Sequence, residues 1–431
     1  ASAAQSYSLT GRFTADQVYG NKRLQGYYAS IAPLHAWIGA LTYRLAEKLQ
    51  TGGLQCFFLL SPFYSACTGY LLAKIGQRRG FSQKTILYSI IIFGFGTLVF
   101  AYSKSYFREP LAMLLITTAY YEMDSACVEQ PGSIRYTLRI ISALVFLVLA
   151  IWTKEFLIAC VPGLIYCFVS GMHKYSSEFL PRKSKVSGKS SKYLWLAILL
   201  LIIILGALFL KDRSGRFSIS YLSRLWTYFP LLNHAHFFES LWRVFFSLSK
   251  GFVVYSPILW LVLLSPIYRK KANIPIPDFV LALSSALGVA ILQVFFYDAE
   301  WWTFTWSTRF MLPVLPFWII CLFPLVEKLL QTKNRWQNLL GYSFLIFSLW
   351  LQMGSVLISS ADYAQFLWDR YHFKLSEINV AHIEAIPAVG HWLAFSQGVI
   401  SDVSWIRIFL SGNLWVVCIP LVLGLLFVLS L

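Results

Sequence analysis

Charged residues that suit phosphate and proton chemistry recur beside apolar segments of the chain. Glu109 precedes Pro110, Lys154 follows a long apolar run, and Lys250 and Arg309 each precede another. Arginine binds phosphate through its planar fork and lysine through a compact charge. A carboxylate can take the proton from an attacking hydroxyl or hold a metal that activates it. One carboxylate and three cations on one face therefore predict group transfer from a phosphate-bearing donor.

Each of these residues also has an ordinary structural interpretation. Glu109-Pro110 suits the start of a helix, because a carboxylate favours the positive end of the helix dipole and proline fits the first turn. Lys154 and Lys250 could be interfacial side chains whose stems lie in apolar surroundings. An aromatic belt would explain a nearby group of tryptophans, Trp301, Trp302 and Trp306. The occurrence of all these residues on one predicted face favours the functional interpretation.

The composition indicates that these residues are positioned by membrane helices. Of the 431 residues, 58% are hydrophobic and 13% charged, whereas soluble domains carry about a quarter charged residues. Continuous apolar runs of about 20 residues favour helices over the alternating strands of a membrane barrel. We predict an all-α polytopic membrane protein with about eleven transmembrane helices, near residues 54–74, 85–102, 110–123, 135–153, 155–171, 193–210, 251–268, 278–297, 310–326, 338–358 and 410–431.

The distribution of lysine and arginine predicts the orientation. With the loop after residue 74 in the cytoplasm, basic residues at 78–84, 174–192, 269–271 and 328–335 are all cytoplasmic. A full crossing by residues 28–48 would reverse every one of these loops, so we predict an interfacial helix there. Glu109, Lys154, Lys250 and Arg309 then share the extracytoplasmic side.

The predicted helices and their orientation divide the chain into four parts. An extracytoplasmic loop and interfacial helix occupy residues 1–53, a transmembrane core 54–358, an extracytoplasmic segment 359–409 and a C-terminal transmembrane helix 410–431. The net charge of +17 lies in short loops, which predicts contact with anionic membrane lipid and no nucleic-acid binding. The seven cysteines form no metal-type CxxC pair and lie mostly in apolar runs, so no disulfide framework is expected.

Five motifs in chain order resemble those of the GT-C class of polyprenyl-phosphate-sugar-dependent glycosyltransferases, the superfamily of the protein O-mannosyltransferases and the lipid A aminoarabinose transferase. They are Gly26-Tyr-Tyr-Ala-Ser-Ile-Ala-Pro33-Leu, Tyr102-Ser-Lys-Ser-Tyr-Phe-Arg-Glu109-Pro110, Thr153-Lys154-Glu155-Phe156, Lys250-Gly251-Phe-Val-Val-Tyr255-Ser256-Pro257 and Trp306-Ser-Thr-Arg309-Phe-Met-Leu-Pro313. Each motif alone is weak, but the ordered set is moderately specific.

The resemblance implies a function and a role for each matching residue. The function would be transfer of a sugar from a polyprenyl-phosphate donor to an extracytoplasmic acceptor, at a bacterial inner membrane. Glu109 would be the catalytic carboxylate, and Lys154, Lys250 and Arg309 would bind the donor phosphate. We expect the substrate pocket to be lined by Tyr255, Trp302 and Trp306.

Two departures from the family pattern bear on this expectation. The family's best-known acid follows its first membrane helix, and by position both should precede Ala1, since Asp16 is a poor substitute. Related enzymes often carry an acid or a lysine before the proline that here is Pro33. Whether the protein binds a divalent metal ion therefore stays open, and the ligands of such an ion are unknown. His234 and His236 would point apart on a helix, which disfavours a metal shared between them.

Two other classes of function compete with the transferase. A GT-C-like scaffold without activity could serve as a structural or lipid-binding subunit of a larger membrane complex, which the missing acid would favour. A transporter is disfavoured, because the charged groups gather at one face rather than midway through broken helices. An acidic residue shortly before Ala1 would support the enzyme over the scaffold.

Overall fold

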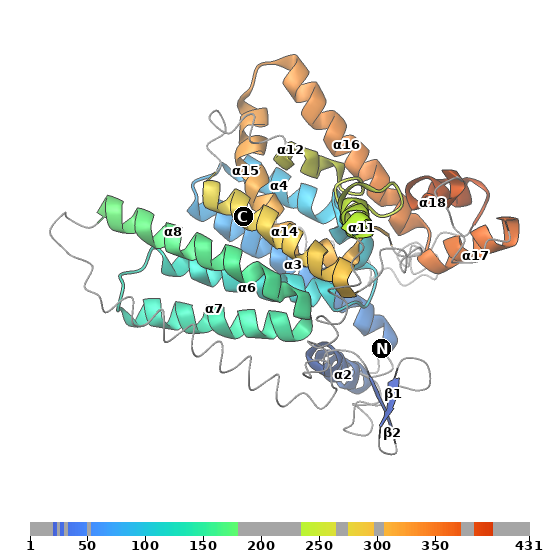
Figure 1. Ribbon diagram of the computed structural model, residues 1–431, viewed down its shortest axis with the longest axis horizontal. Coiled ribbons are helices and arrows are strands. Elements are labelled where there is room, and N and C mark those ends of the chain that lie inside the picture. Colours follow the sequence, from blue (N-terminus) through green and yellow to red (C-terminus); the bar gives the residue numbers. More distant parts are fainter. Residues whose placement is uncertain are drawn as a thin grey trace.

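The computed structural model describes residues 20–23, 26–29, 33–49, 53–179, 234–263, 275–296, 306–371 and 383–399. Helices form almost all of these residues, so the prediction of a helical fold is confirmed (Figure 1). Two predicted membrane helices, at 193–210 and 410–431, lie outside the described residues.

A short hairpin near the start is the one departure from an all-helical chain in the described part. Strands β1 (Gly20–Arg23) and β2 (Gly26–Ala29) pair antiparallel, with Arg23 opposite Gly26. Pairing two adjacent short segments satisfies their backbone N–H and C=O groups. Helix α2 (Pro33–Lys48) begins only at the proline, which suits the first turn of a helix. The predicted interfacial helix is therefore shorter, because Tyr28 belongs to β2.

The first half of the bundle consists of helices that run back and forth between its two ends. In order these are α3 (Gly53–Arg78), α4 (Gln83–Phe95), α5 (Leu98–Ser103), α6 (Glu109–Ala126), α7 (Ile134–Thr153), the 3-10 helix η1 (Glu155–Cys160) and α8 (Val161–Phe179). Figure 1 shows α6, α7 and α8 side by side, and contacts join α6 to α7 and to α8.

The second half of the bundle adds several short elements and the helix at the centre of the core, α15 (Leu315–Gln331). The elements are α11 (His234–Phe246), η3 (Pro257–Leu259), α12 (Trp260–Leu263), α14 (Ile276–Phe296), η5 (Arg309–Val314), α15 (Leu315–Gln331), α16 (Arg335–Leu357), α17 (Ser360–Tyr371), η6 (Ile383–Ala385) and α18 (Pro387–Ser396). Helices α17 and α18 lie beyond the end of α16 in Figure 1, and the Trp350 and Trp392 rings stack at 5.3 Å to join α16 to α18.

Five helical stretches in the described part are long and apolar enough to cross a membrane. They are Ile134–Thr153, Glu155–Met172, Ile276–Phe295, Arg309–Gln331 and Arg335–Leu357. All five coincide with predicted membrane helices, but the total of about eleven is not confirmed.

The predicted helix at 85–102 is broken in two by one threonine. The Thr97 hydroxyl donates to the Phe93 carbonyl at 2.6 Å and accepts from the Val99 N–H at 3.3 Å. The same side chain thus bonds to the last turn of α4, which ends before Gly96, and caps α5. Hydropathy alone cannot show such a break, because both flanking segments are apolar.

Helix α15 lies at the centre of the core. Helices α7 and α16 expose apolar side chains on the outside of the bundle. Nearly all of α15 is buried, including Trp318 and Phe323. By contrast, α7 exposes Leu138 and α16 exposes Ile346 and Trp336. Long exposed apolar stripes on two helices of the described chain fit a hydrocarbon environment better than water.

A charged network holds one end of the bundle. Arg79, near the end of α3, contacts Asp278 of α14 at 2.5 Å and Asp124 of α6 at 3.4 Å. The Tyr120 hydroxyl donates to Asp278 at 2.8 Å. Because α6 runs away from Glu109 toward this network, the network and Glu109 lie at opposite ends of α6.

Candidate functional site

Three sequence-predicted residues from distant segments meet at the end of the bundle opposite that network. Glu109 is the first residue of α6, Lys154 links α7 to η1, and Arg309 begins η5. The Glu109 Oε1 atom lies 3.6 Å from Lys154 Nζ and 3.8 Å from Arg309 Nε. The Glu109 and Lys154 side chains are almost fully buried, whereas that of Arg309 is 20% exposed. The carboxylate is thus held by two cations at the edge of the core.

The turn between α7 and η1 aims Lys154 into this site. Its N–H still donates to Ala150 at 2.8 Å, while its carbonyl accepts from Leu157 at 3.0 Å, so the extended residue belongs to both helices. The ammonium lies 3.5 Å from the centroid of the Phe310 ring and 4.9 Å from that of Phe156. Such cation–π contacts stabilise a charge that burial has separated from water.

Contacts of the preceding segment hold Arg309 in place. The Tyr102 hydroxyl donates to the Trp306 carbonyl at 2.5 Å. Ser307 has a φ of 55°, in the left-handed region that only a few per cent of non-glycine residues adopt, and its hydroxyl donates to the Lys250 carbonyl at 2.8 Å. The Arg309 guanidinium lies 4.8 Å from the centroid of the Phe107 ring. Three of the family-like motifs therefore pack together around one arginine.

A second ion pair borders the first. The Arg108 guanidinium lies 3.6 Å from a Glu155 carboxylate oxygen. Arg108 and Glu155 directly adjoin Glu109 and Lys154 in the sequence. The site therefore contains three cations and two carboxylates, an excess of positive charge that suits an anionic ligand.

Burial and neighbouring charges set the protonation of the two buried groups. Burial, together with the nearby Arg108 charge, lowers the pKa of Lys154 to about 7. Burial opposes ionisation of Glu109, but Arg309, Lys154 and Arg108 outweigh it and hold the pKa of the carboxyl below its usual range. Glu109 is thus an anion at neutral pH, while Lys154 is close to its titration midpoint.

One oxygen of Glu109 has no hydrogen-bonding role in the described part of the chain. Oε1 faces the two cations, whereas Oε2 is buried and makes no hydrogen bond there. Lys154 Nζ likewise makes no hydrogen bond to a described residue. Since buried polar atoms are nearly always paired, these two atoms are the ones that a ligand at this site would be expected to pair.

Lys250 is buried, and its backbone is what joins it to the segment that carries Arg309. Its backbone carbonyl accepts from Thr308 N–H at 3.1 Å as well as from the Ser307 hydroxyl. The structure therefore connects Lys250 to the site through the segment that carries Arg309. A direct contact of its ammonium with phosphate stays a prediction.

Two of the three predicted pocket aromatics lie together in the core. The Tyr255 and Trp306 rings meet edge to face at 5.0 Å. The Tyr255 hydroxyl donates to Leu248 at 2.9 Å, and Trp306 Nε1 donates to Gln352 at 3.1 Å. Their polar atoms are thus used within the protein, and their contact with substrate stays a prediction. Trp302 lies outside the described residues.

Sequence reasoning did not single out Arg108, Glu155 or the ring of Phe310. Each of the three is the direct sequence neighbour of a predicted site residue, and this position could have indicated that it belongs to the site. It also missed His35, a buried histidine of α2, because a lone histidine in an apolar helix carries no motif.

The described residues contain no group of three or more histidine, cysteine, aspartate or glutamate side chains that could hold a metal ion. The side chains of His234 and His236 lie outside the described part. Metal binding therefore stays a prediction, and no chemical step below depends on it.

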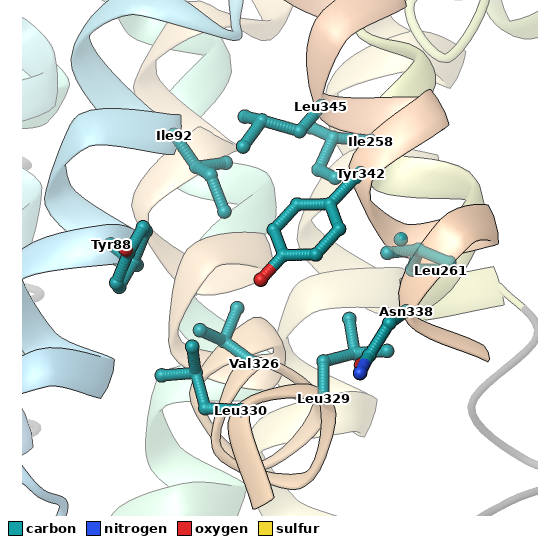
Figure 2. Close-up of a pocket in the computed structure, with 11 residues that line it drawn as sticks. Tyr88, Ile92, Ile258, Leu261, Val326, Leu329, Leu330, Asn338, Tyr342 and Leu345 are labelled. Carbon is teal, nitrogen blue, oxygen red and sulfur yellow. The ribbon is translucent and has the colours of Figure 1, made fainter. Parts of the chain in front are cut away.

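A cavity at the other end of the bundle is apolar. It lies between α4, α12, α15 and α16, and Figure 2 shows Tyr342 beside Ile92, Val326 and Leu330. None of the predicted site residues lines it. The cavity therefore does not belong to the charged site.

Comparison with known families supports the resemblance. Residues 56–220 match the model of the dolichyl-phosphate-mannose-protein mannosyltransferase family. No curated protein and no solved structure matches the chain. The matched range contains Glu109 and Lys154 but not Arg309, so the contact between Arg309 and Glu109 is a separate observation.

Proposed function

We propose that the protein is a membrane glycosyltransferase that moves mannose from a polyprenyl-phosphate donor to an acceptor hydroxyl. Its family match supports the reaction class and the donor class. The observation that carries the assignment to this site is the buried Glu109 carboxylate, with Oε1 beside Lys154 and Arg309 and Oε2 unbonded in the described part.

The cations would bind the donor phosphate. Arg309 is partly exposed, so it can receive the phosphate at the site edge, while buried Lys154 can approach the same group from the core side. Charge-assisted hydrogen bonds of this kind are about twice as strong as neutral ones. A bound phosphate would also favour the protonated form of Lys154, because an adjacent anion raises the pKa of a lysine.

Glu109 would then serve as the base in a single displacement. The acceptor oxygen forms a bond to the anomeric carbon of mannose as the bond from that carbon to the phosphate oxygen breaks. The electron pair leaves with polyprenyl phosphate, and the acceptor proton passes to Oε2 of Glu109. Lys154 and Arg309 stabilise the charge that develops on the leaving phosphate, and attack from the opposite side inverts the anomeric configuration.

We also propose where the site lies and how the donor reaches it. The site lies on the extracytoplasmic side of a bacterial inner membrane, where the donor lipid reaches it from the bilayer. The acceptor is a protein, lipid or glycan hydroxyl on that side. Anionic lipid contacts the basic loops at the opposite end.

A transfer assay tests this proposal. Full-length protein in liposomes is incubated with polyprenyl phosphate carrying labelled mannose and with an extract of cell-envelope acceptors. We expect label to move from the lipid to an acceptor, with release of polyprenyl phosphate. Lipid binding without any transfer would contradict the enzyme and support the lipid-binding scaffold.

A further inference from the structure

His35 is a buried histidine whose ring has no hydrogen-bond partner in the described part of the chain. It lies on α2, is 3% exposed, and neither Nδ1 nor Nε2 makes a hydrogen bond there. The ring stacks on that of Tyr106 with centroids 4.1 Å apart and an angle of 25°. The Tyr106 hydroxyl in turn donates to the His35 carbonyl at 2.8 Å. The ring orientation is thus fixed, while its two polar atoms are unused by described residues.

The ring lies close to the charged site. Tyr106, on which the ring stacks, precedes Glu109 by three residues, and the Glu109 carboxylate acts to raise the pKa of the imidazole. Burial outweighs that attraction and lowers the pKa of His35 to about 3. The imidazole is therefore neutral at physiological pH, with one nitrogen as donor and the other as acceptor.

A neutral, buried donor and acceptor suits a hydroxyl better than a phosphate. An anionic phosphate is bound best by charged donors, which Lys154 and Arg309 supply beside Glu109. A hydroxyl both donates and accepts, as the imidazole does. In a glycosyl phosphate, the sugar is bonded directly to the phosphate, so its hydroxyls lie within a few bonds of the group that these cations would bind.

We propose that His35 binds a hydroxyl group of the sugar carried by the donor. This inference rests on the proposed function, because it assumes that a sugar phosphate occupies the site beside Glu109. His35 would then favour the sugar-bearing lipid over the bare lipid phosphate through a contact with the sugar itself.

Two lipids and two variants test the inference. Binding of short-chain polyprenyl phosphate and of its mannosyl derivative is measured with purified full-length protein. His35→Phe keeps an aromatic ring on Tyr106 but removes both nitrogens. We expect this variant to bind the mannosyl lipid about tenfold more weakly, the loss expected for one hydrogen bond, with unchanged binding of the bare phosphate.

The conservative variant and the second lipid separate recognition from folding. His35→Asn supplies a neutral amide that can donate and accept, so we expect its affinity for the mannosyl lipid to lie between those of wild type and His35→Phe. An equal loss for both lipids, or no loss in His35→Phe, would overturn the inference. A wild-type protein that binds neither lipid would instead contradict the proposed function itself.

Discussion

The Lys154 ammonium is enclosed by one carboxylate and two aromatic rings. Glu109 Oε1 is 3.6 Å away, and the centroids of the Phe310 and Phe156 rings are 3.5 Å and 4.9 Å away. A lysine that only extends toward the membrane surface would keep its charged end in water. Burial of the charged end therefore favours a binding role over the interfacial interpretation.

This environment predicts that donor binding depends on pH. The lowered pKa of Lys154, about 7, means that this lysine in the free site is mostly protonated below pH 7 and loses its proton as the pH rises. We expect affinity for the mannosyl phosphodiester to fall between pH 6 and 9, by up to tenfold per pH unit above the midpoint. The diester itself does not titrate in this range, unlike a phosphomonoester.

Lys154→Arg is the matched control, because arginine keeps its charge throughout this range. Binding to this variant should be independent of pH from 6 to 9. A wild-type protein with flat binding over the same range would show that Lys154 does not contact the phosphate in its titrating form.

Glu109→Gln tests the proposed base. The amide keeps the shape of the carboxylate but cannot accept the proton, so we expect the transfer rate to fall by 10²-fold or more, about 3 kcal/mol of barrier. Lys154 can lose its proton in this variant, which limits the cost of leaving it without an anion. The transfer rate and thermal unfolding are measured together. Wild-type turnover would return Glu109 to the role of a helix-start residue.

At the scale of elements, α16 fixes the loops that lead to the site. Gln352 donates to the Tyr255 carbonyl and accepts from Trp306 Nε1, and the Ser348 hydroxyl accepts from the Ile258 N–H at 2.9 Å. These side chains satisfy backbone groups of the segment after Gly251. The sequence predicts a helix from residue 251, but the chain becomes helical only at Pro257. Non-helical backbone within a membrane protein is tolerated where protein groups pair it.

Gly251→Ala tests how tightly this segment is packed. A methyl group there would lie 2.6 Å from the Ser247 carbonyl oxygen and 2.7 Å from that of Phe245. Because backbone atoms cannot move aside as side chains do, we expect destabilisation of about 1–3 kcal/mol. A lower melting temperature and weaker donor binding should follow, since Lys250 holds the residues before Arg309.

The control is Gly94→Ala, in α4, where the added methyl group meets nothing within 4 Å. Alanine favours a helix over glycine by about 1 kcal/mol, so this variant should be as stable as wild type or more so. A Gly251→Ala protein with an unchanged melting temperature would contradict the described path of the segment.

The sequence predicts the features that depend on neighbouring residues in the chain, and it does not predict those that depend on contacts between distant residues. Hydropathy over some 20 residues identifies α7, α14, α15 and α16, because a membrane span is a local property. The motif order identifies Glu109, Lys154 and Arg309, but their mutual contact depends on tertiary packing. The break at Thr97 and the stacking of His35 on Tyr106 depend on single hydrogen bonds and ring contacts, which leave no periodic pattern.

At the scale of the whole molecule, the two ends of the bundle differ in how their charged side chains are paired. At one end, Arg79 pairs with both Asp124 and Asp278, so these charges are used within the protein. At the other end, Glu109 Oε2 and Lys154 Nζ make no hydrogen bond to described residues. Within the described residues, the second end therefore has the form of a site for a charged ligand.

The predicted orientation puts the ligand site outside the cell. Ser187 should then be cytoplasmic and Ser401 extracytoplasmic, because lysine and arginine gather in the loops on the side of Ser187. Cysteines placed at either position, in a background without reactive thiols, are probed in intact cells with an impermeant thiol reagent. We expect labelling at 401 alone. Labelling at 187 alone would reverse the map.

The central claim is that Lys154, Lys250 and Arg309 bind a lipid phosphate, and lipid binding tests it most directly. Short-chain polyprenyl phosphate is titrated into wild type and into Lys154→Met, Lys250→Met and Arg309→Met, with Arg243→Met as the control. Arg243 pairs with Glu239 on the exposed face of α11, so its loss should leave binding unchanged.

Each site variant removes a charge-assisted contact of about 1.5–3 kcal/mol, so the affinity should fall by about 10- to 100-fold. This experiment needs neither the sugar nor the acceptor. A loss in the site variants with none in Arg243→Met is the result that the phosphate site predicts. Wild-type affinity in Lys154→Met, Lys250→Met and Arg309→Met would contradict it.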